Sequence, residues 1–152
     1  MKKKRSARLG IVADLEERKR KQADQFLAEH VKRVENDKVQ LLQLETYLVE
    51  YQQQYKVTCA NGISVQSLMS YQNFMAKVGR VIDQHKVSMK VNLEQLQGVK
   101  VYWSKVCARQ NAVDSLIVKL KNKEQYAADK ALQQLIDEAS LQNFNKSPNS
   151  RA

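Results

Sequence analysis

Helix-breaking residues are scarce in this sequence, which has one proline and four glycines among 152 residues. The single proline, Pro148, lies close to the C-terminal end. Proline and glycine interrupt helices and build most turns, so a chain with so few of them favours long helices over a mixed or all-β fold. The length alone suggests one domain.

Cysteines and long apolar runs are also scarce. Cys59 and Cys107 have no paired spacing, so the sequence predicts no disulfide framework and fits a reducing compartment. No run of about eighteen apolar residues is present, so we expect no membrane-spanning segment. No apolar stretch follows the basic N-terminus, so we expect no secretory signal. These absences predict a cytoplasmic protein.

Motifs that indicate catalysis are missing as well. The sequence contains no glycine-rich phosphate loop, no G-x-S-x-G and no paired-cysteine metal spacing. Its two histidines, His30 and His85, lie far apart in the sequence. We therefore predict that the protein is not an enzyme, and we expect no catalytic, cofactor-binding or metal-binding residues and no small-molecule substrate.

Positive charge is the strongest bias in the composition, with a formal net charge of +10. Nine lysines and arginines fall within residues 2–21. A basic balance attracts nucleic acid, anionic lipid or an acidic protein surface, and composition does not choose among them. A solvated basic tail and helix face is the simpler interpretation.

The most regular feature of the sequence lies between Leu68 and Leu120. Alternating steps of three and four residues reach sixteen positions there, and thirteen of them are apolar. The positions are Leu68, Tyr71, Met75, Val78, Ile82, His85, Met89, Asn92, Leu96, Val99, Trp103, Val106, Gln110, Val113, Ile117 and Leu120. This heptad spacing is typical of a helix that packs along a partner helix in a coiled coil.

A candidate partner helix precedes it in the sequence. The same steps reach fourteen positions from residue 9 to residue 55, of which ten are apolar. They are Leu9, Ala13, Glu16, Arg20, Ala23, Leu27, His30, Val34, Asp37, Leu41, Leu44, Leu48, Tyr51 and Tyr55. The two sets of positions are called the seam below.

The stretch between the two seams carries turn and capping residues. Asn61-Gly62 is suited to ending a helix, because both residues tolerate a positive φ. Ser64 can cap the following helix by accepting a hydrogen bond from its first turn. We therefore predict helices at 9–57 and 65–141, joined by a loop at 58–64.

Folding the chain at this loop aligns the two seams in one continuous register. The predicted fold class is therefore all-α, an antiparallel two-helix coiled-coil hairpin with the C-terminal helix longer than the N-terminal one. The register places His85 opposite Asp37 and His30 opposite Asn92, which predicts buried ion pairs or hydrogen bonds that fix the alignment.

The two ends of the chain have no seam of their own. We expect a basic N-terminal segment at 1–8 ahead of the coiled-coil hairpin at 9–141. The polar stretch that follows is expected to form a disordered tail at 142–152.

A second apolar stripe flanks the seam near the loop. Phe74 and Val81 lie beside the seam on the second predicted helix, and Tyr47 lies beside it on the first. A two-helix protein has no third layer to cover these side chains, so we interpret them as part of an exposed docking surface. The alternative is that they only thicken the seam next to the turn.

The segments around this stripe resemble the FliJ family. They read Leu41-x-x-Leu44-x-x-Tyr47-x-x-x-Tyr51, Asn61-Gly62-Ile63, Tyr71-Gln72-x-Phe74 and Val81-Ile82-x-Gln84-His85, in this order. FliJ proteins are small cytoplasmic coiled-coil components of the bacterial flagellar type III export apparatus. The similarity covers roughly residues 9–140 and is most specific between 40 and 86.

The resemblance implies a hairpin similar to the central stalk of rotary ATPases. Such a protein couples the hexameric flagellar export ATPase to the cytoplasmic domain of the membrane export gate, and helps to recycle export chaperones. The implied location is cytoplasmic, with peripheral association at the cytoplasmic face of the inner membrane at the flagellar base. The implied role is in flagellum assembly and motility.

The resemblance also implies a set of residues that dock the export gate. Carried over position by position, they are Gln40, Leu44, Tyr47, Tyr51, Phe74, Val78, Val81 and His85. Val78 and Val81 stand where leucine and alanine are more usual in the family. Leu44, Tyr51 and His85 belong to the seam as well, so we expect them to be partly exposed.

Three alternative functions stay open at this point. The first is the equivalent stalk protein of a virulence-type injectisome, although the Tyr71-Gln72-x-Phe74 segment favours the flagellar branch. The second is a basic coiled coil that binds nucleic acid, but charges beyond the N-terminus are mixed in sign, and we expect no nucleic-acid partner. The third is a homo-oligomeric parallel coiled coil, which would leave the matched seams and the loop without a role.

Overall fold

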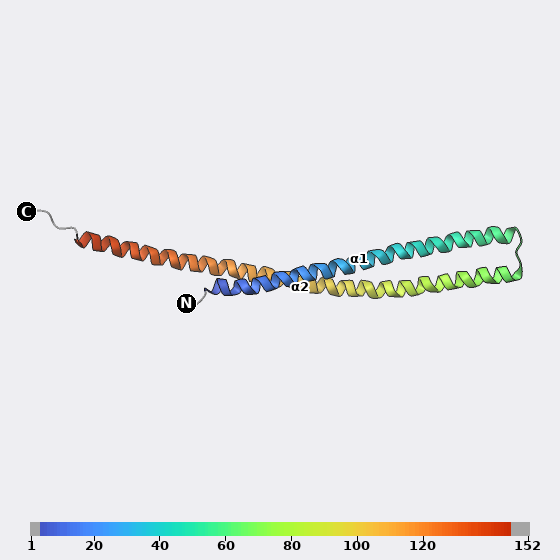
Figure 1. The fold of residues 1–152 in the computed structure, drawn as a ribbon, viewed down its shortest axis with the longest axis horizontal. Coiled ribbons are helices and arrows are strands. Elements are labelled where there is room, and N and C mark those ends of the chain that lie inside the picture. Colours follow the sequence, from blue (N-terminus) through green and yellow to red (C-terminus); the bar gives the residue numbers. More distant parts are fainter. Residues whose placement is uncertain (1–3, 147–152) are drawn as a thin grey trace, which may run out of the picture. The chain divides into compact units, whose positions relative to one another are not determined.

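The computed structural model describes residues 4–146, and nearly all of them are helical (Figure 1). Helix α1 spans Arg5–Ala60 and helix α2 spans Val65–Lys146. The described part of the chain contains no strand. The two helices pack against each other as a helical hairpin, and α2 with 82 residues is longer than α1 with 56. The predicted all-α hairpin with a longer C-terminal helix is confirmed.

The helix ends lie close to the predicted ones. Helix α1 begins before the predicted start at residue 9 and continues beyond residue 57. Helix α2 begins at the predicted residue 65 and continues beyond the predicted end at residue 141. Both helices are therefore longer than the apolar pattern predicts.

The longer helices include part of each terminal segment that the sequence places outside the hairpin. The described parts of the basic segment 1–8 and of the tail 142–152 are almost entirely helical. The remaining residues of those segments, 1–3 and 147–152, lie outside the described residues.

The chain divides into two compact units. The first, called the loop unit below, is Arg20–Lys105. The second, called the terminal unit, is Met1–Lys19 with Val106–Ala152, of which the structure describes 4–19 and 106–146. In each unit a segment of α1 packs against a segment of α2.

The connection between α1 and α2 is a short turn that uses the predicted residues. Gly62 has a φ of 84°, a left-handed conformation that glycine adopts without a steric penalty. Its N–H donates to the carbonyl oxygen of Cys59 at 3.2 Å. The Oγ of Ser64 accepts a hydrogen bond from the N–H of Ser67 at 3.2 Å, so Ser64 caps α2 as predicted.

The core of the loop unit consists of seam residues. Every seam position between residues 20 and 105 is buried or half-buried. The buried ones are Ala23, His30, Val34, Val78, Ile82, Leu96 and Val99. Apolar side chains on the outer faces, such as Val49 and Val87, are exposed. The predicted seam is therefore confirmed in this unit.

Polar seam residues of the loop unit bind one another across the interface. His85 Nε2 donates to the backbone carbonyl oxygen of Asp37 at 2.8 Å. Asn92 Nδ2 donates to Asp37 Oδ2 at 2.7 Å. The prediction that His85 faces Asp37 is confirmed, although the hydrogen bond goes to the main chain and not to the carboxylate.

The predicted pairing of His30 with Asn92 is wrong. Asn92 donates its hydrogen bond to the carboxylate of Asp37 instead. His30 Nδ1 lies 2.9 Å from the carbonyl oxygen of Phe26, one turn earlier on its own helix. The buried imidazole of His30 therefore finds its partner without the second helix.

In the terminal unit a carboxylate of α2 binds the first turn of α1. Glu124 Oε2 accepts a hydrogen bond from Ser6 Oγ at 2.6 Å, and Glu124 Oε1 accepts one from the Ser6 backbone N–H at 3.2 Å. First-turn N–H groups have no acceptor within their own helix, so Glu124 acts as an N-terminal cap from another helix. Ser6 is buried by this contact.

The same hydrogen bonds lower the pKa of Glu124 below its ordinary value. The largest cause is the bond from the Ser6 hydroxyl, followed by the bond from the Ser6 backbone. The positive charges of Lys4 and Lys121 lower the pKa further, against the opposing effect of desolvation. The ionised form of Glu124 is therefore the form that caps α1.

Beyond Glu124, helix α2 continues without cover from the described chain. Every residue from 125 to 146 is exposed, including large apolar side chains such as Leu135 and Phe144. The sequence predicts this extension, because the apolar pattern of the second helix continues beyond the positions that face the start of the first helix.

Truncation of a seam residue should lower stability far more than truncation of an outer one. Ile82 is 6% exposed, and Ile82→Ala leaves a cavity that we expect to cost about 2 kcal/mol or more in free energy of unfolding. Val87 is 66% exposed, and Val87→Ala should not destabilise, because alanine is the better helix former. Urea unfolding followed by circular dichroism measures both variants, and equal losses would contradict the seam.

The cap at Ser6 should depend on pH through Glu124. A lowered folded-state pKa means that the cap stabilises fully above the unfolded pKa of about 4.3, and is lost as the pH falls through the folded pKa. The difference in thermal stability between wild type and Glu124→Gln should therefore be constant above about pH 5.5 and shrink on acidification. Glu138→Gln, on the exposed extension of α2, is the control, and its difference from wild type should not follow this pH course.

Candidate protein-interaction site

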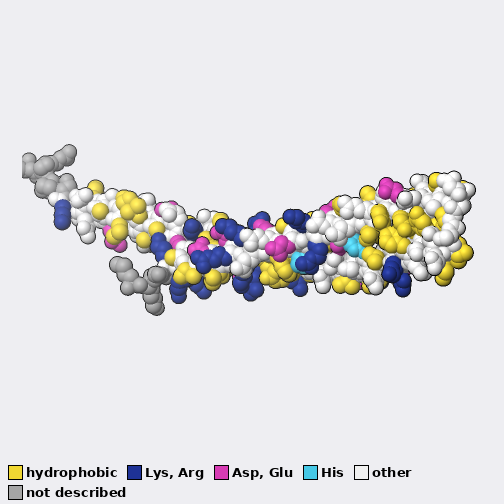
Figure 2. Space-filling view, turned by 45° about the vertical axis from the view of Figure 1, so that its right-hand side comes forward, with side chains coloured by type: hydrophobic (Ala, Val, Ile, Leu, Met, Phe, Trp, Pro, Cys, Tyr) yellow, Lys and Arg dark blue, Asp and Glu magenta, His cyan; other side chains and the backbone are white. Residues whose placement is uncertain are grey.

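Five aromatic rings form one continuous cluster next to the turn. Tyr47, Tyr51 and Tyr55 recur every four residues on α1, and Tyr71 and Phe74 face them from α2. The ring-centroid distances are 4.5 Å for Tyr51–Phe74, 5.2 Å for Tyr51–Tyr71, 5.7 Å for Tyr55–Tyr71, 6.2 Å for Tyr47–Phe74 and 6.3 Å for Tyr47–Tyr51. Figure 2 shows hydrophobic side chains gathered toward this end of the hairpin.

Tyr51 lies at the centre of the cluster and contacts three of the other rings. Desolvation raises the pKa of Tyr51 above its ordinary value of 10.0, and the neighbouring Tyr71 and Tyr47 raise it further. Tyr51 is therefore neutral at physiological pH. The cluster offers an uncharged aromatic surface.

Residues that flank the seam carry this cluster to the surface. Tyr47 and Val81 are each 48% exposed. Phe74 is half-buried between the rings of Tyr47 and Tyr51. Because no third layer covers this part of the loop unit, these side chains form an apolar surface that a partner can contact.

A groove lies beside the cluster on α1. Gln40, Gln43, Leu44 and Tyr47 line it, and its volume is about 400 Å³. Gln43 is absent from the predicted docking residues, although it lies three residues after Gln40 and four before Tyr47 on the same helix face. In this groove the side-chain amides of the two glutamines lie next to the side chains of Leu44 and Tyr47.

The eight predicted docking residues differ in how accessible they are. Gln40, Tyr47 and Val81 are exposed, whereas Val78 is buried at 9% exposure. The half-buried members are Leu44, Tyr51, Phe74 and His85. Direct ring contacts join Tyr47, Tyr51 and Phe74. The accessible part of the predicted set is therefore smaller than eight residues.

His85 marks the end of the candidate site that lies away from the turn. Its hydrogen bond to the Asp37 carbonyl holds the imidazole in the seam. One residue further along α2, Lys86 pairs with Glu45 of α1 at 3.8 Å, at the exposed edge of the interface. The candidate site thus passes from an uncharged aromatic surface near the turn to a polar one at His85.

An aromatic surface with nearby amide groups is typical of protein–protein contacts, where tyrosine and phenylalanine are enriched. Within residues 4–146, no group of three or more His, Cys, Asp and Glu side chains could hold a metal ion. No helix in the described part of the chain is long and apolar enough to cross a membrane. The features of the site are those of a protein-binding surface on a coiled coil.

The two packed helices define a coiled-coil hairpin protein. A family model described as flagellar FliJ protein matches residues 5–149, which is nearly the whole chain. The chain belongs to the FliJ family, whose members are non-enzymatic components of the flagellar protein export apparatus. No curated protein and no solved structure matches the chain.

The central and the peripheral tyrosine of the cluster should differ in their effect on stability. Tyr51 packs between both helices, and Tyr51→Ala should cost about 2 kcal/mol or more in free energy of unfolding. Tyr47 is 48% exposed, and Tyr47→Ala should cost less than about 1 kcal/mol. Chemical denaturation followed by circular dichroism compares them. A larger loss for Tyr47→Ala would show that Tyr47 is a core residue and not a surface one.

Proposed function

We propose that this FliJ-family protein is a stalk-like coupler that joins the hexameric flagellar export ATPase to the cytoplasmic domain of the membrane export gate. In this proposal the aromatic surface next to the turn docks the gate. The protein also helps to recycle export chaperones, and it is needed for flagellum assembly and motility. It acts in the cytoplasm and associates peripherally with the cytoplasmic face of the inner membrane.

The exposure of Tyr47 and Val81 is the observation that carries this proposal. Each is 48% exposed although its neighbours Tyr51 and Val78 pack into the seam. Removing apolar surface of this kind from water favours association, and aromatic side chains contribute most to such contacts. The same residues belong to the segments that resemble the family most closely.

Charge supports the proposed contact with the ATPase. The terminal unit carries both the basic stretch of α1 and the exposed extension of α2. Lysine and arginine side chains attract acidic protein surfaces and speed their encounter. The terminal unit therefore suits the ATPase, and the aromatic surface of the loop unit suits the gate.

A pull-down with the purified export ATPase and the gate cytoplasmic domain tests the proposal. Tyr47→Ala combined with Val81→Ala removes exposed apolar surface and leaves the seam intact. We expect this variant to lose at least about tenfold in affinity for the gate and to bind the ATPase as wild type does. Val49→Ser combined with Val57→Ser is the matched control, because these residues are 52% and 62% exposed on the same helix.

Other outcomes separate the competing functions. Loss of both partners in the Tyr47 and Val81 variant would contradict a local docking surface. Wild-type protein that binds neither partner would contradict the coupler. If the wild-type protein instead bound nucleic acid with a steep salt dependence, a nucleic-acid-binding function would replace the coupler function.

A further inference from the structure

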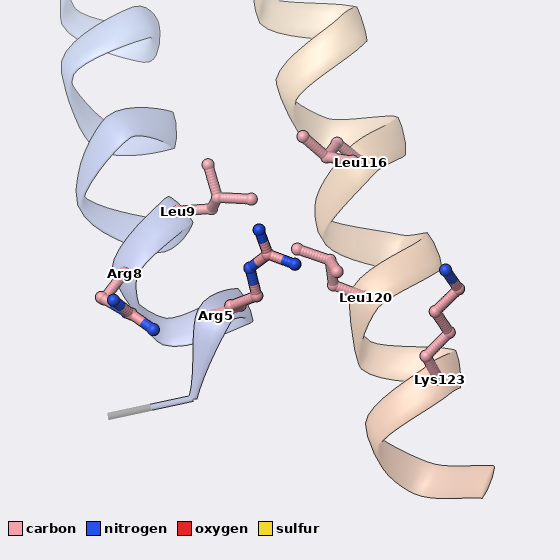
Figure 3. Close-up of a pocket in the computed structure, with 6 residues that line it drawn as sticks. All are labelled: Arg5, Arg8, Leu9, Leu116, Leu120 and Lys123. Carbon is pink, nitrogen blue, oxygen red and sulfur yellow. The ribbon is translucent and has the colours of Figure 1, made fainter. Parts of the chain in front are cut away.

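Pockets that combine apolar side chains with cations occur in both units of the chain. The one in the terminal unit has a volume of about 460 Å³, and Figure 3 shows the Arg5 guanidinium there, extending between the two helices. It belongs to the basic stretch that the proposed ATPase contact uses. A second pocket, of about 270 Å³, lies in the loop unit between residues 34–38 of α1 and 86–93 of α2. This second one is called the lysine pocket below.

The floor of the lysine pocket is aliphatic. Val34 is buried at 8% exposure, and Met89 is half-buried in the seam. Leu93 is 55% exposed, so part of the apolar lining is open to solvent. Methionine is flexible and polarizable, and it is common at surfaces that accept different apolar groups. The floor therefore suits an apolar side chain that enters from outside.

Three lysines surround this floor. Lys38 comes from α1, and Lys86 and Lys90 come from α2, where they lie one turn apart. All three are exposed. Asp37 is the one carboxylate among the lining residues, and its Oδ2 accepts the hydrogen bond from Asn92. Three lysines against one aspartate give the lining a net positive charge.

The carboxylates beside the pocket hold these lysines only weakly. Lys38 lies 3.5 Å from Glu35, and the two side chains are 60% and 64% exposed. Lys86 lies 3.8 Å from Glu45, and these side chains are 56% and 47% exposed. Ion pairs this exposed contribute little to stability, so a carboxylate of a partner can replace either one. No ion pair within the described residues involves Lys90.

The lysine pocket and the aromatic surface lie along opposite edges of the seam. Tyr47 and Val81 each precede a seam residue by one position, whereas Lys38 and Lys86 each follow one. Successive residues of an α-helix are turned by about 100°, so the two sets of flanking positions lie on different sides of the seam. A molecule in the lysine pocket therefore does not occupy the surface proposed to dock the gate.

We propose that the lysine pocket binds an acidic peptide segment of a partner protein. A leucine or phenylalanine of the segment enters the aliphatic floor, and glutamates or aspartates beside it bind the three lysines. Lys38 and Lys86 lie at the end of the pocket nearer the turn, and Leu93 lies at the other end. The carboxylates are therefore on the side of the turn, and the apolar side chain is next to Leu93.

The charge and the lining of the pocket favour this occupant over others. A positively charged rim selects a negatively charged partner and speeds its encounter. A second copy of this chain is disfavoured, because each copy carries a formal net charge of +10. Single-stranded nucleic acid binds by stacking its bases on aromatic side chains, and no aromatic residue lines this pocket.

Methyl NMR of the full chain with carbon-13 labels on the methionine methyl groups tests the proposal. Met89 lines the pocket, whereas Met69 and Met75 lie elsewhere in the loop unit and serve as internal references. The probes are the peptides Ser-Glu-Glu-Leu-Glu-Glu-Ser and Ser-Glu-Glu-Phe-Glu-Glu-Ser. Titration to about 5 mM should shift the Met89 signal with a dissociation constant of about 1 mM or tighter, and should leave both reference signals in place.

Matched peptides separate the two parts of the proposed contact. A peptide with glutamine in place of each glutamate lacks the charge, and one with serine in place of the leucine lacks the apolar side chain. Each should bind at least about fivefold more weakly than its parent. Raising the salt from about 0.05 M to about 0.5 M should weaken binding of the parent peptides, because the lysines are exposed and their charges are screened.

Variants of the chain locate the contact. Lys38→Gln combined with Lys90→Gln should lower the affinity for both peptides by at least about fivefold, and so should Leu93→Ser. Lys56→Gln combined with Lys77→Gln is the matched control, because it also removes one exposed lysine from each helix of the loop unit. Circular dichroism should show the wild-type helix content for all of them, since the replaced side chains are exposed.

The gate and the ATPase take no part in these measurements. Peptide binding therefore stands or fails independently of the proposed coupler function. The Tyr47→Ala, Val81→Ala variant should bind both peptides as wild type does.

Three results would overturn the proposal. The first is a Met89 signal that neither acidic peptide shifts. The second is a shift of Met75 as large as that of Met89, which would place the peptides on the aromatic surface beside Phe74. The third is an equal loss of affinity in the Lys38, Lys90 variant and in the Lys56, Lys77 control, which would show that the peptides respond to net charge alone.

Discussion

The seam residues pack between two helices only, because the described chain has no third layer. Each buried side chain therefore packs against one neighbouring helix, and most seam residues are half-buried. The free energy gained by burial is distributed in small increments along the helices instead of being concentrated in one core. Apolar side chains outside the seam, such as Tyr47 and Ile11, are only partly covered within the hairpin. The candidate binding surfaces are thus a direct result of the two-helix architecture.

Aliphatic packing alone defines the alignment of such helices weakly, since leucine, valine and isoleucine recur at every heptad. The polar contacts at Asp37 need one particular alignment of the two helices, whereas aliphatic packing does not. Its carbonyl oxygen binds His85 and its carboxylate binds Asn92, and a shift of seven residues would break both of these hydrogen bonds. Glu16 is less well satisfied, because one of its carboxylate oxygens is buried without a hydrogen bond. The alignment of the loop unit is therefore defined by a few polar groups.

The spacing of apolar residues contains nearly all of the information that determines the fold. It predicts the two helices, their antiparallel packing and the buried positions, because heptad spacing translates directly into one helix face. The apolar spacing does not predict where the helices begin and end. Continuing the same steps beyond Leu9 and Leu120 leads to Ser6 and Glu124, two polar residues whose mutual hydrogen bonds no apolar pattern reveals. In the candidate site, spacing identifies Tyr47 and Val81 as flanking residues. It does not reveal that Asn92 binds Asp37 and not His30, because apolar spacing carries no information on contacts between polar side chains.

The part of α2 beyond Glu124 has a consequence for motion. Residues 125–146 are helical although every one of them is exposed, so only their own main-chain bonds and short-range contacts such as Gln125–Asp129 maintain the helix. Most of the stability of a helix in a protein comes from tertiary packing, which this segment lacks. Its amide hydrogens should therefore exchange with solvent far sooner than those of the seam, which open only when the helices separate. Exchange would slow when a binding partner covers this segment, so the amides of residues 125–146 are a built-in reporter of assembly.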